Sequence, residues 1–143
     1  MSEKKNWNVD FCVVGAGLAG MCAALAAARH GAKVLVIHDR PIPGGNASSE
    51  IRMWVCGAHG KDLHETGIVE ELLLENLYRN PGAVPAVWDS ILYGSLEYAE
   101  NIKLLLNCSC HILSFVYLKI WGLLAPYFFI LLFLRLEYPC QGK

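Results

Sequence analysis

Three glycines at a fixed spacing form the pattern in this chain that most directly indicates chemistry. The run Gly15-Ala16-Gly17-Leu18-Ala19-Gly20 has the form G-x-G-x-x-G. Between a strand and a helix, such a run binds a pyrophosphate: the first glycine allows a tight turn, the second admits the phosphates, and the third lets the helix pack on the strand. The helix N-terminus then presents N–H groups and a positive dipole end to the phosphates. The alternative is a glycine-rich turn that binds nothing.

A second element of such a site is an acidic residue about 20 positions further on, which holds the ribose hydroxyls. Here His38 directly follows the apolar run VLVI, and Asp39 and Arg40 come next. We expect Asp39 to reach the ribose, with His38 as the alternative hydrogen-bond donor and Arg40 beside them in the same cofactor site.

A double glycine shortly after this point suggests close approach to a large flat ligand. Its backbone can pass near the ligand, and the following amide and hydroxyl groups can supply hydrogen bonds. The alternative is a plain surface loop. The run is Gly44-Gly45-Asn46-Ala47-Ser48-Ser49, and we expect its first five residues to contact the cofactor.

The segments around the first glycine motif are those that a pyrophosphate site requires. Residues 9–14 and 33–37 are short apolar runs that predict buried parallel strands, and residues 18–30, rich in alanine, predict a slim helix between them. Gly31 suits the end of that helix. Strand, helix and strand form a βαβ unit.

Two further helices and a third strand are predicted downstream. A helix after Thr66 carries an apolar stripe and ends at Asn80-Pro81-Gly82; a second spans residues 87–100, and a strand follows at residues 102–106. The first helix should bury the stripe and leave its glutamates on a solvated face. The stripe consists of Ile68, Leu72, Leu73 and Leu77, and the glutamates are Glu70, Glu71 and Glu75. The fold class is α/β, with a partial Rossmann-like domain at residues 1–110.

The bulk composition excludes several classes of function. The chain has 143 residues and a net charge of −1, so it holds one domain at most and has no basic stripe for nucleic acid. The polar N-terminus lacks a secretory signal, which predicts a cytoplasmic, reducing environment. The six cysteines contain no Cys-x-x-Cys pair, so no metal site is predicted, and Cys12 and Cys22 are expected to be small buried apolar groups.

The composition changes abruptly in residues 111–143. Residues 112–134 contain one charge, Lys119, and one proline, Pro126, and they meet the usual criterion for a transmembrane helix. Three interpretations compete: a genuine membrane span, a buried core segment, and an aberrant C-terminus fused to a truncated domain. We favour the third, because a nucleotide-binding domain has no physical need for such a run at this position.

Taken together, the motifs resemble a known family. The runs VVGAGLAG, VLVIHDRPIPGGNASSEIRMWVCGAHG, ETGIVEELLLENLYRNP, WDSILY and NIKLLLNC are similar to bacterial FAD-dependent oxidoreductases of the glutathione-reductase-like superfamily. The resemblance covers about residues 7–108, and the run GGNASSEIR is its most specific part. It implies FAD as cofactor, with its ADP half on the glycine motif, and a redox reaction on a substrate that the sequence does not name.

In related flavoproteins the segment after the double glycine runs beside the flavin, so the resemblance makes three residues there candidates for catalysis. Arg52 would stabilise negative charge on a reduced flavin or a substrate carboxylate, His59 would act as an acid–base group or a covalent flavin anchor, and Cys56 would be a redox thiol. A structural role is the alternative for each.

The leading hypothesis is therefore an FAD-dependent oxidoreductase, present as an N-terminal fragment. One alternative is a fragment of an NAD-dependent dehydrogenase, which would share the first glycine motif but would not explain the Gly-Gly-Asn loop. Another is a catalytically inactive, truncated or membrane-associated product.

Overall fold

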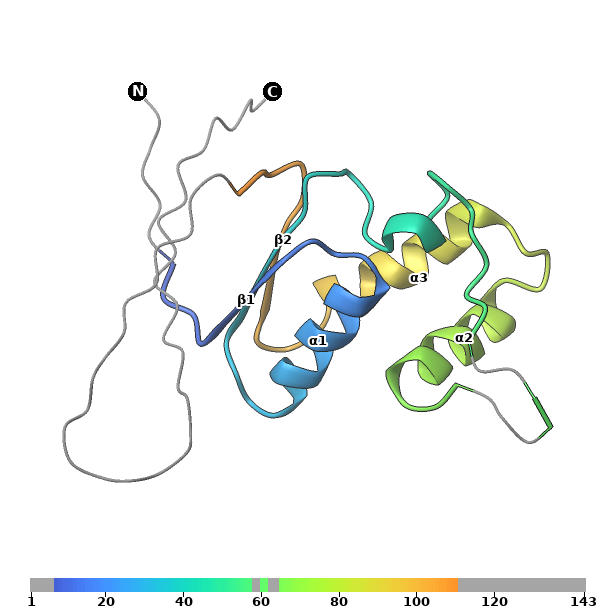
Figure 1. Ribbon diagram of the computed structural model, residues 1–143, viewed down its shortest axis with the longest axis horizontal. Helices are drawn as coiled ribbons and strands as arrows, with labels where there is room; N and C mark the ends of the chain where they lie inside the picture. The colour runs from blue at the N-terminus through green and yellow to red at the C-terminus, as the bar shows by residue number, and fades with distance from the viewer. Residues whose placement is uncertain (1–6, 58–59, 62–64, 111–143) are drawn as a thin grey trace.

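The computed structural model describes residues 7–57, 60–61 and 65–110 (Figure 1). The C-terminal segment at residues 111–143, including the predicted apolar helix at 112–134, lies outside the described residues. None of the helices in the described ranges is both long and apolar enough to cross a membrane.

The three predicted strands form one parallel sheet. They are β1 (Phe11–Val14), β2 (Val34–Ile37) and β3 (Ile102–Leu105), in the order β1-β2-β3. All four residues of the central strand β2 are buried, as a parallel strand with both faces covered requires. Since the strands are parallel, their carboxyl ends share one edge of the sheet, and the loops that begin at Gly15 and His38 leave from that edge.

Helices cover one face of this sheet. α1 (Leu18–Arg29) and α3 (Pro85–Glu97) both contact the strands, and α2 (Ile68–Arg79) packs against α1 and α3 (Figure 1). These bounds confirm the predicted helices to within three residues. The core on this face combines Val34 and Val36 with residues of all three helices, among them Met21, Leu72 and Leu92.

The segments next to the outer strands cover the opposite face. Leu35 and Ile37 point there and pack with Cys108, while Trp7, Val9 and Cys12 add partly buried contacts. Alternate residues of β2 thus enter two different cores, which explains why the run VLVI is apolar throughout.

One residue of α2 departs from the sequence expectation, and another has a contact that was not expected. Leu77 was predicted on the buried stripe, but it is 73% exposed, whereas Leu72 is 6% exposed. The stripe prediction is wrong at Leu77, because only the turns near Leu72 face the other helices. Glu71 is exposed as predicted, yet it also forms a bidentate pair with Arg29 of α1, with N–O distances of 2.8 and 2.5 Å.

Candidate functional site

The glycine loop leaves the carboxyl end of β1 and leads directly into α1. Gly15 has φ of +102°, a conformation that favours glycine, and its N–H donates to Ile37 O at 2.7 Å. A Cβ at Gly20 would lie 2.0 Å from Gly15 O, whereas one at Gly17 would meet no atom within 4 Å. Gly20 is thus required for close packing of helix on strand, and Gly17 borders open space.

The second glycine motif lies against the first. Gly17 and Gly44 form an isolated parallel bridge, and the Gly44 N–H donates to Ala16 O at 2.6 Å. A Cβ at Gly45 would lie 3.1 Å from Gly17 Cα, which is tighter than most Cβ contacts, so the two backbones approach closely here. Two motifs separated by more than twenty residues therefore meet at the N-terminus of α1.

We call the hollow at this meeting point the glycine cradle. It has a volume of about 450 Å³, and its walls come from the start of α1, the 3-10 turn η1 (Gly45–Ala47) and the segment that follows. Most of its lining was predicted from the glycine motifs, but residues 53–55 were not, since nothing in their types indicates a ligand. The lining residues are Gly17, Leu18, Ala19, Gly44, Gly45, Asn46, Ala47, Met53, Trp54 and Val55.

Other predicted site residues lie behind the cradle wall. Ala16 and Ser48 are fully buried. The Ser48 hydroxyl donates to Gly45 O at 2.7 Å, so its side chain stabilises the loop from within. With Gly15 and Gly20, these residues shape the backbone of the cradle and do not line it.

The residues after β2 divide into one buried and two exposed side chains. His38 is 6% exposed; its Nδ1 lies 3.2 Å from the Ala16 N and its Nε2 lies 3.1 Å from Ile42 O. Both ring nitrogens therefore face protein groups, which is a different placement from that expected of a ribose ligand. The Asp39 side chain is 69% exposed, and Arg40 pairs with Glu50 at 3.1 Å.

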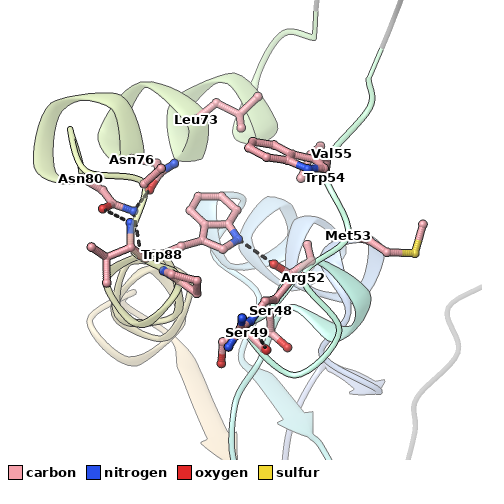
Figure 2. A pocket seen from close by; sticks show the side chains of 14 residues that line it. Ser48, Ser49, Arg52, Met53, Trp54, Val55, Leu73, Asn76, Asn80 and Trp88 are labelled. Atoms are coloured by element: carbon pink, nitrogen blue, oxygen red, sulfur yellow. Dashed lines mark hydrogen bonds between the residues drawn. The ribbon is translucent and has the colours of Figure 1, made fainter.

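Helix α3 anchors the loop that carries the double glycine. Asp89 Oδ1 accepts the Ser49 N–H at 2.8 Å, and the Trp88 indole N–H donates to Ala47 O at 2.9 Å, as Figure 2 shows for Trp88. Neither residue was assigned a role from the sequence, although they begin the run WDSILY. Their side chains hold the loop from a helix about 40 positions away in the chain.

A second cavity, of about 360 Å³, is lined in part by residues of the segment 47–55 (Figure 2). It shares Ala47, Met53, Trp54 and Val55 with the glycine cradle, and helices α2 and α3 add Leu73 and Trp88 to its lining. One segment of chain therefore lines both cavities.

The three candidate catalytic residues have different positions. Arg52 lines the second cavity, has a left-handed backbone with φ of +63°, and donates from Nε to Ser49 O at 3.2 Å. Cys56 is exposed and lines neither cavity. His59 lies outside the described residues. Across the ranges that the structure describes, no three His, Cys, Asp or Glu side chains gather as a metal site would require.

The sheet topology, the glycine loop and the cradle at the N-terminus of α1 together define a dinucleotide-binding domain of the Rossmann type. Residues 10–112 match the family model described as FAD dependent oxidoreductase. Because this match covers most of the chain, the protein belongs to the FAD dependent oxidoreductases, and FAD is the cofactor of its family.

Curated relatives match over shorter stretches. The chain is 42% identical over 48 residues to the alpha subunit of sarcosine oxidase from Rhizobium meliloti. It is 50% identical over 42 residues to one of the subunits of opine oxidase from Agrobacterium tumefaciens, and 54% identical over 39 residues to a fumarate reductase (cytochrome) of Shewanella frigidimarina. The matches cover 33%, 29% and 27% of this chain, but only 5%, 8% and 7% of those proteins.

Proposed function

We propose that the glycine cradle binds the ADP half of FAD, and that this chain provides the FAD-holding part of a flavin-dependent oxidoreductase. The observation that carries the proposal is the bridge between Gly17 and Gly44, which places both glycine motifs at the N-terminus of α1. The family assignment favours FAD over the NAD alternative.

The electrostatics of the cradle suit a pyrophosphate. The first amides of a helix lack intrahelical partners, and the helix dipole favours an anion there. Within the described residues, no side chain caps α1 at Gly17 and its first turn holds no acidic residue. By contrast, Glu70 and Glu71 occupy the first turn of α2, where they would repel a phosphate.

Asp39 is our proposed ligand for the ribose hydroxyls. Its carboxylate is exposed beside the carboxyl end of β2, while the neighbouring His38 ring is turned into the protein. Replacing Asp39 with alanine should weaken FAD binding about tenfold to a hundredfold, because a hydrogen bond to a charged group contributes roughly 1.5–3 kcal/mol. Unchanged affinity in a titration of this variant would assign the ribose to another residue.

When bound, FAD supplies the hydride chemistry of such an enzyme. The residues of this chain bind the cofactor, orient it and exclude water from it. We propose that Arg52, held by Ser49 O at the edge of the second cavity, stabilises negative charge close to the cofactor. We propose that the whole oxidoreductase carries out a redox reaction on its substrate with this cofactor. Cys56 and His59 are further candidates for a role in that reaction.

The substitution Gly17→Val tests the cradle directly. A Cβ at Gly17 meets no protein atom within 4 Å, so the variant should fold while its side chain occupies the space of the pyrophosphate. Gly82→Val is the matched control, since a Cβ there meets only Val84 at 3.6 Å, far along the chain from the cradle. In FAD titrations followed by flavin fluorescence, we expect the first variant alone to lose binding. Equal affinity of Gly17→Val and the parent chain would refute the cradle as the pyrophosphate site.

A further inference from the structure

His38 joins the two segments of chain that build the glycine cradle. Its Nδ1 lies 3.2 Å from the backbone N of Ala16, inside the first glycine motif, and its Nε2 lies 3.1 Å from Ile42 O, just before the second. The ring is 6% exposed, so water competes little for either contact. A backbone hydrogen bond from the Gly44 N–H to Ala16 O also joins the same two segments.

These two contacts define the protonation state of the ring. The Ala16 N–H is a donor, so Nδ1 must carry a lone pair to accept it; the Ile42 carbonyl is an acceptor, so Nε2 must carry the proton. Only the neutral Nε2–H tautomer satisfies both partners, because the charged ring would present a second donor to the Ala16 N–H.

We propose that His38, in its neutral Nε2–H tautomer, is a positioning residue for the FAD site, holding the first glycine motif at a fixed distance from the second. This inference rests on the proposed function of the cradle. Because the Ala16 N–H is directed inward to His38, it does not face the cradle, and the amides that follow it at the start of α1 are left for the phosphates.

The same geometry separates the roles of His38 and Asp39. Asp39 Oδ1 lies 3.5 Å from His38 Nδ1. In the Nε2–H tautomer Nδ1 has no proton to donate, so the Asp39 carboxylate is not held by the ring and stays open to the ribose. The charged side chains of Arg40 and Glu50 on this loop pair with each other at 3.1 Å and so do not compete for Asp39.

Three substitutions in the full chain separate the contacts. His38→Leu removes both, His38→Asn retains an acceptor near the place of Nδ1, and His38→Gln retains a donor near the place of Nε2. His30→Leu is the control, because His30 is an exposed histidine at the opposite end of α1, away from the glycine cradle.

The four variants should differ in their affinity for FAD. We expect His38→Leu to weaken FAD binding by about tenfold or more, because it removes both contacts and leaves the buried Ala16 N–H without its acceptor. We expect His38→Asn to recover more of the affinity than His38→Gln, and His30→Leu to bind as the parent chain does.

Nitrogen-15 NMR of the ligand-free parent chain gives a readout that does not depend on FAD or on the folding of a variant. A protonated Nε2 and an unprotonated Nδ1 at His38 are expected. An Nδ1–H tautomer or a charged ring would overturn the proposal, as would equal FAD affinity of His38→Leu and the parent or equal losses in His38→Leu and His38→Asn. A parent chain that binds no FAD contradicts the proposed function itself, whereas a parent that binds FAD beside an unaffected His38→Leu contradicts only the role of His38.

Discussion

Asp89 Oδ1 accepts the backbone N–H of Ser49 at 2.8 Å, and this contact joins helix α3 to the loop that carries the double glycine. Asp89 is 9% exposed, so its carboxylate is a buried acceptor, and the adjacent Trp88 donates to Ala47 O in the same loop. The wall of the cradle is therefore held in place by a helix that does not itself line the cradle.

Removing this carboxylate should loosen the wall. In Asp89→Ala the Ser49 N–H loses its acceptor, which should lower the free energy of unfolding by about 1–3 kcal/mol and weaken FAD binding as well. Asp89→Asn keeps an amide oxygen for the same N–H and should lose less of both. Urea denaturation and FAD titration of the two variants provide the measurement, and equal effects would contradict the anchoring role of the Ser49 contact.

Close packing at Gly20 can be tested with a pair of alanine substitutions. A Cβ at Gly20 would lie 2.0 Å from Gly15 O, so Gly20→Ala must shift the helix from the strand and should destabilise the fold by about 1–3 kcal/mol. Within α3, a Cβ at Gly94 would make an ordinary contact of 3.6 Å with Tyr98. Gly94→Ala should therefore raise the free energy of unfolding by about 0.5–1 kcal/mol, the usual gain of alanine over glycine inside a helix. If Gly20→Ala also raised the free energy of unfolding, the turn at Gly15 would have to move at no energetic cost, which would contradict close packing at Gly20.

The pair between Arg29 and Glu71 predicts a small dependence of stability on pH. The hydrogen bonds from Arg29 lower the pKa of Glu71 below its ordinary value of 4.5. A carboxyl whose folded pKa is lowered contributes its stability above the ordinary value and loses it as the pH falls through the lowered one. Both side chains are about half exposed, so this contribution is at most about 1 kcal/mol.

Glu71→Gln should lower the free energy of unfolding at neutral pH and have little effect in acid, as measured by denaturation across that range. Glu100→Gln, at an exposed glutamate beyond α3, is the control. If the two variants behave alike at every pH, the pair between α1 and α2 does not contribute.

Cys12 and Cys56 should differ sharply in their reactivity towards alkylating reagents. Burial, and to a smaller extent the nearby Cys110, raises the pKa of Cys12 to about 12, so almost none of this thiol is in the reactive thiolate form near neutral pH. Cys56 is exposed. Iodoacetamide should therefore modify Cys56 in the folded protein and reach Cys12 only after unfolding, as peptide mass spectrometry would show. Labelling of both at similar rates would mean that β1 opens readily.

Local pattern was sufficient to predict the helices and strands and the two glycine motifs that supply most of the lining of the glycine cradle. The apolar runs at β1 and β2 differ from the alanine-rich α1 in period and composition, and the two glycine motifs mark the places where backbones approach. Each of these signals depends only on residues that are close together in the sequence, so it can be recognised without knowledge of the fold.

Three features could not be predicted, because each depends on contacts between distant segments. The sequence left His38 as the alternative to Asp39 at the ribose, and no local pattern indicated that its ring turns inward to accept the buried Ala16 N–H. Asp89 and Ser49 are 40 positions apart, and no local pattern connects them. On α2, apolar residues occur on more than one side, and only the packing of α1 and α3 shows that Leu72 is covered while Leu77 is not.

A map of the backbone amides that respond to FAD would test the glycine cradle most directly. Nitrogen-15 spectra of the full chain, recorded while FAD is added, would report each amide separately. We predict that the largest shifts fall at residues 17–19 and 44–47, the two segments that the bridge between Gly17 and Gly44 brings together. Shifts centred elsewhere, or no shifts at these residues on saturation with FAD, would contradict the assignment of the glycine cradle as the FAD site.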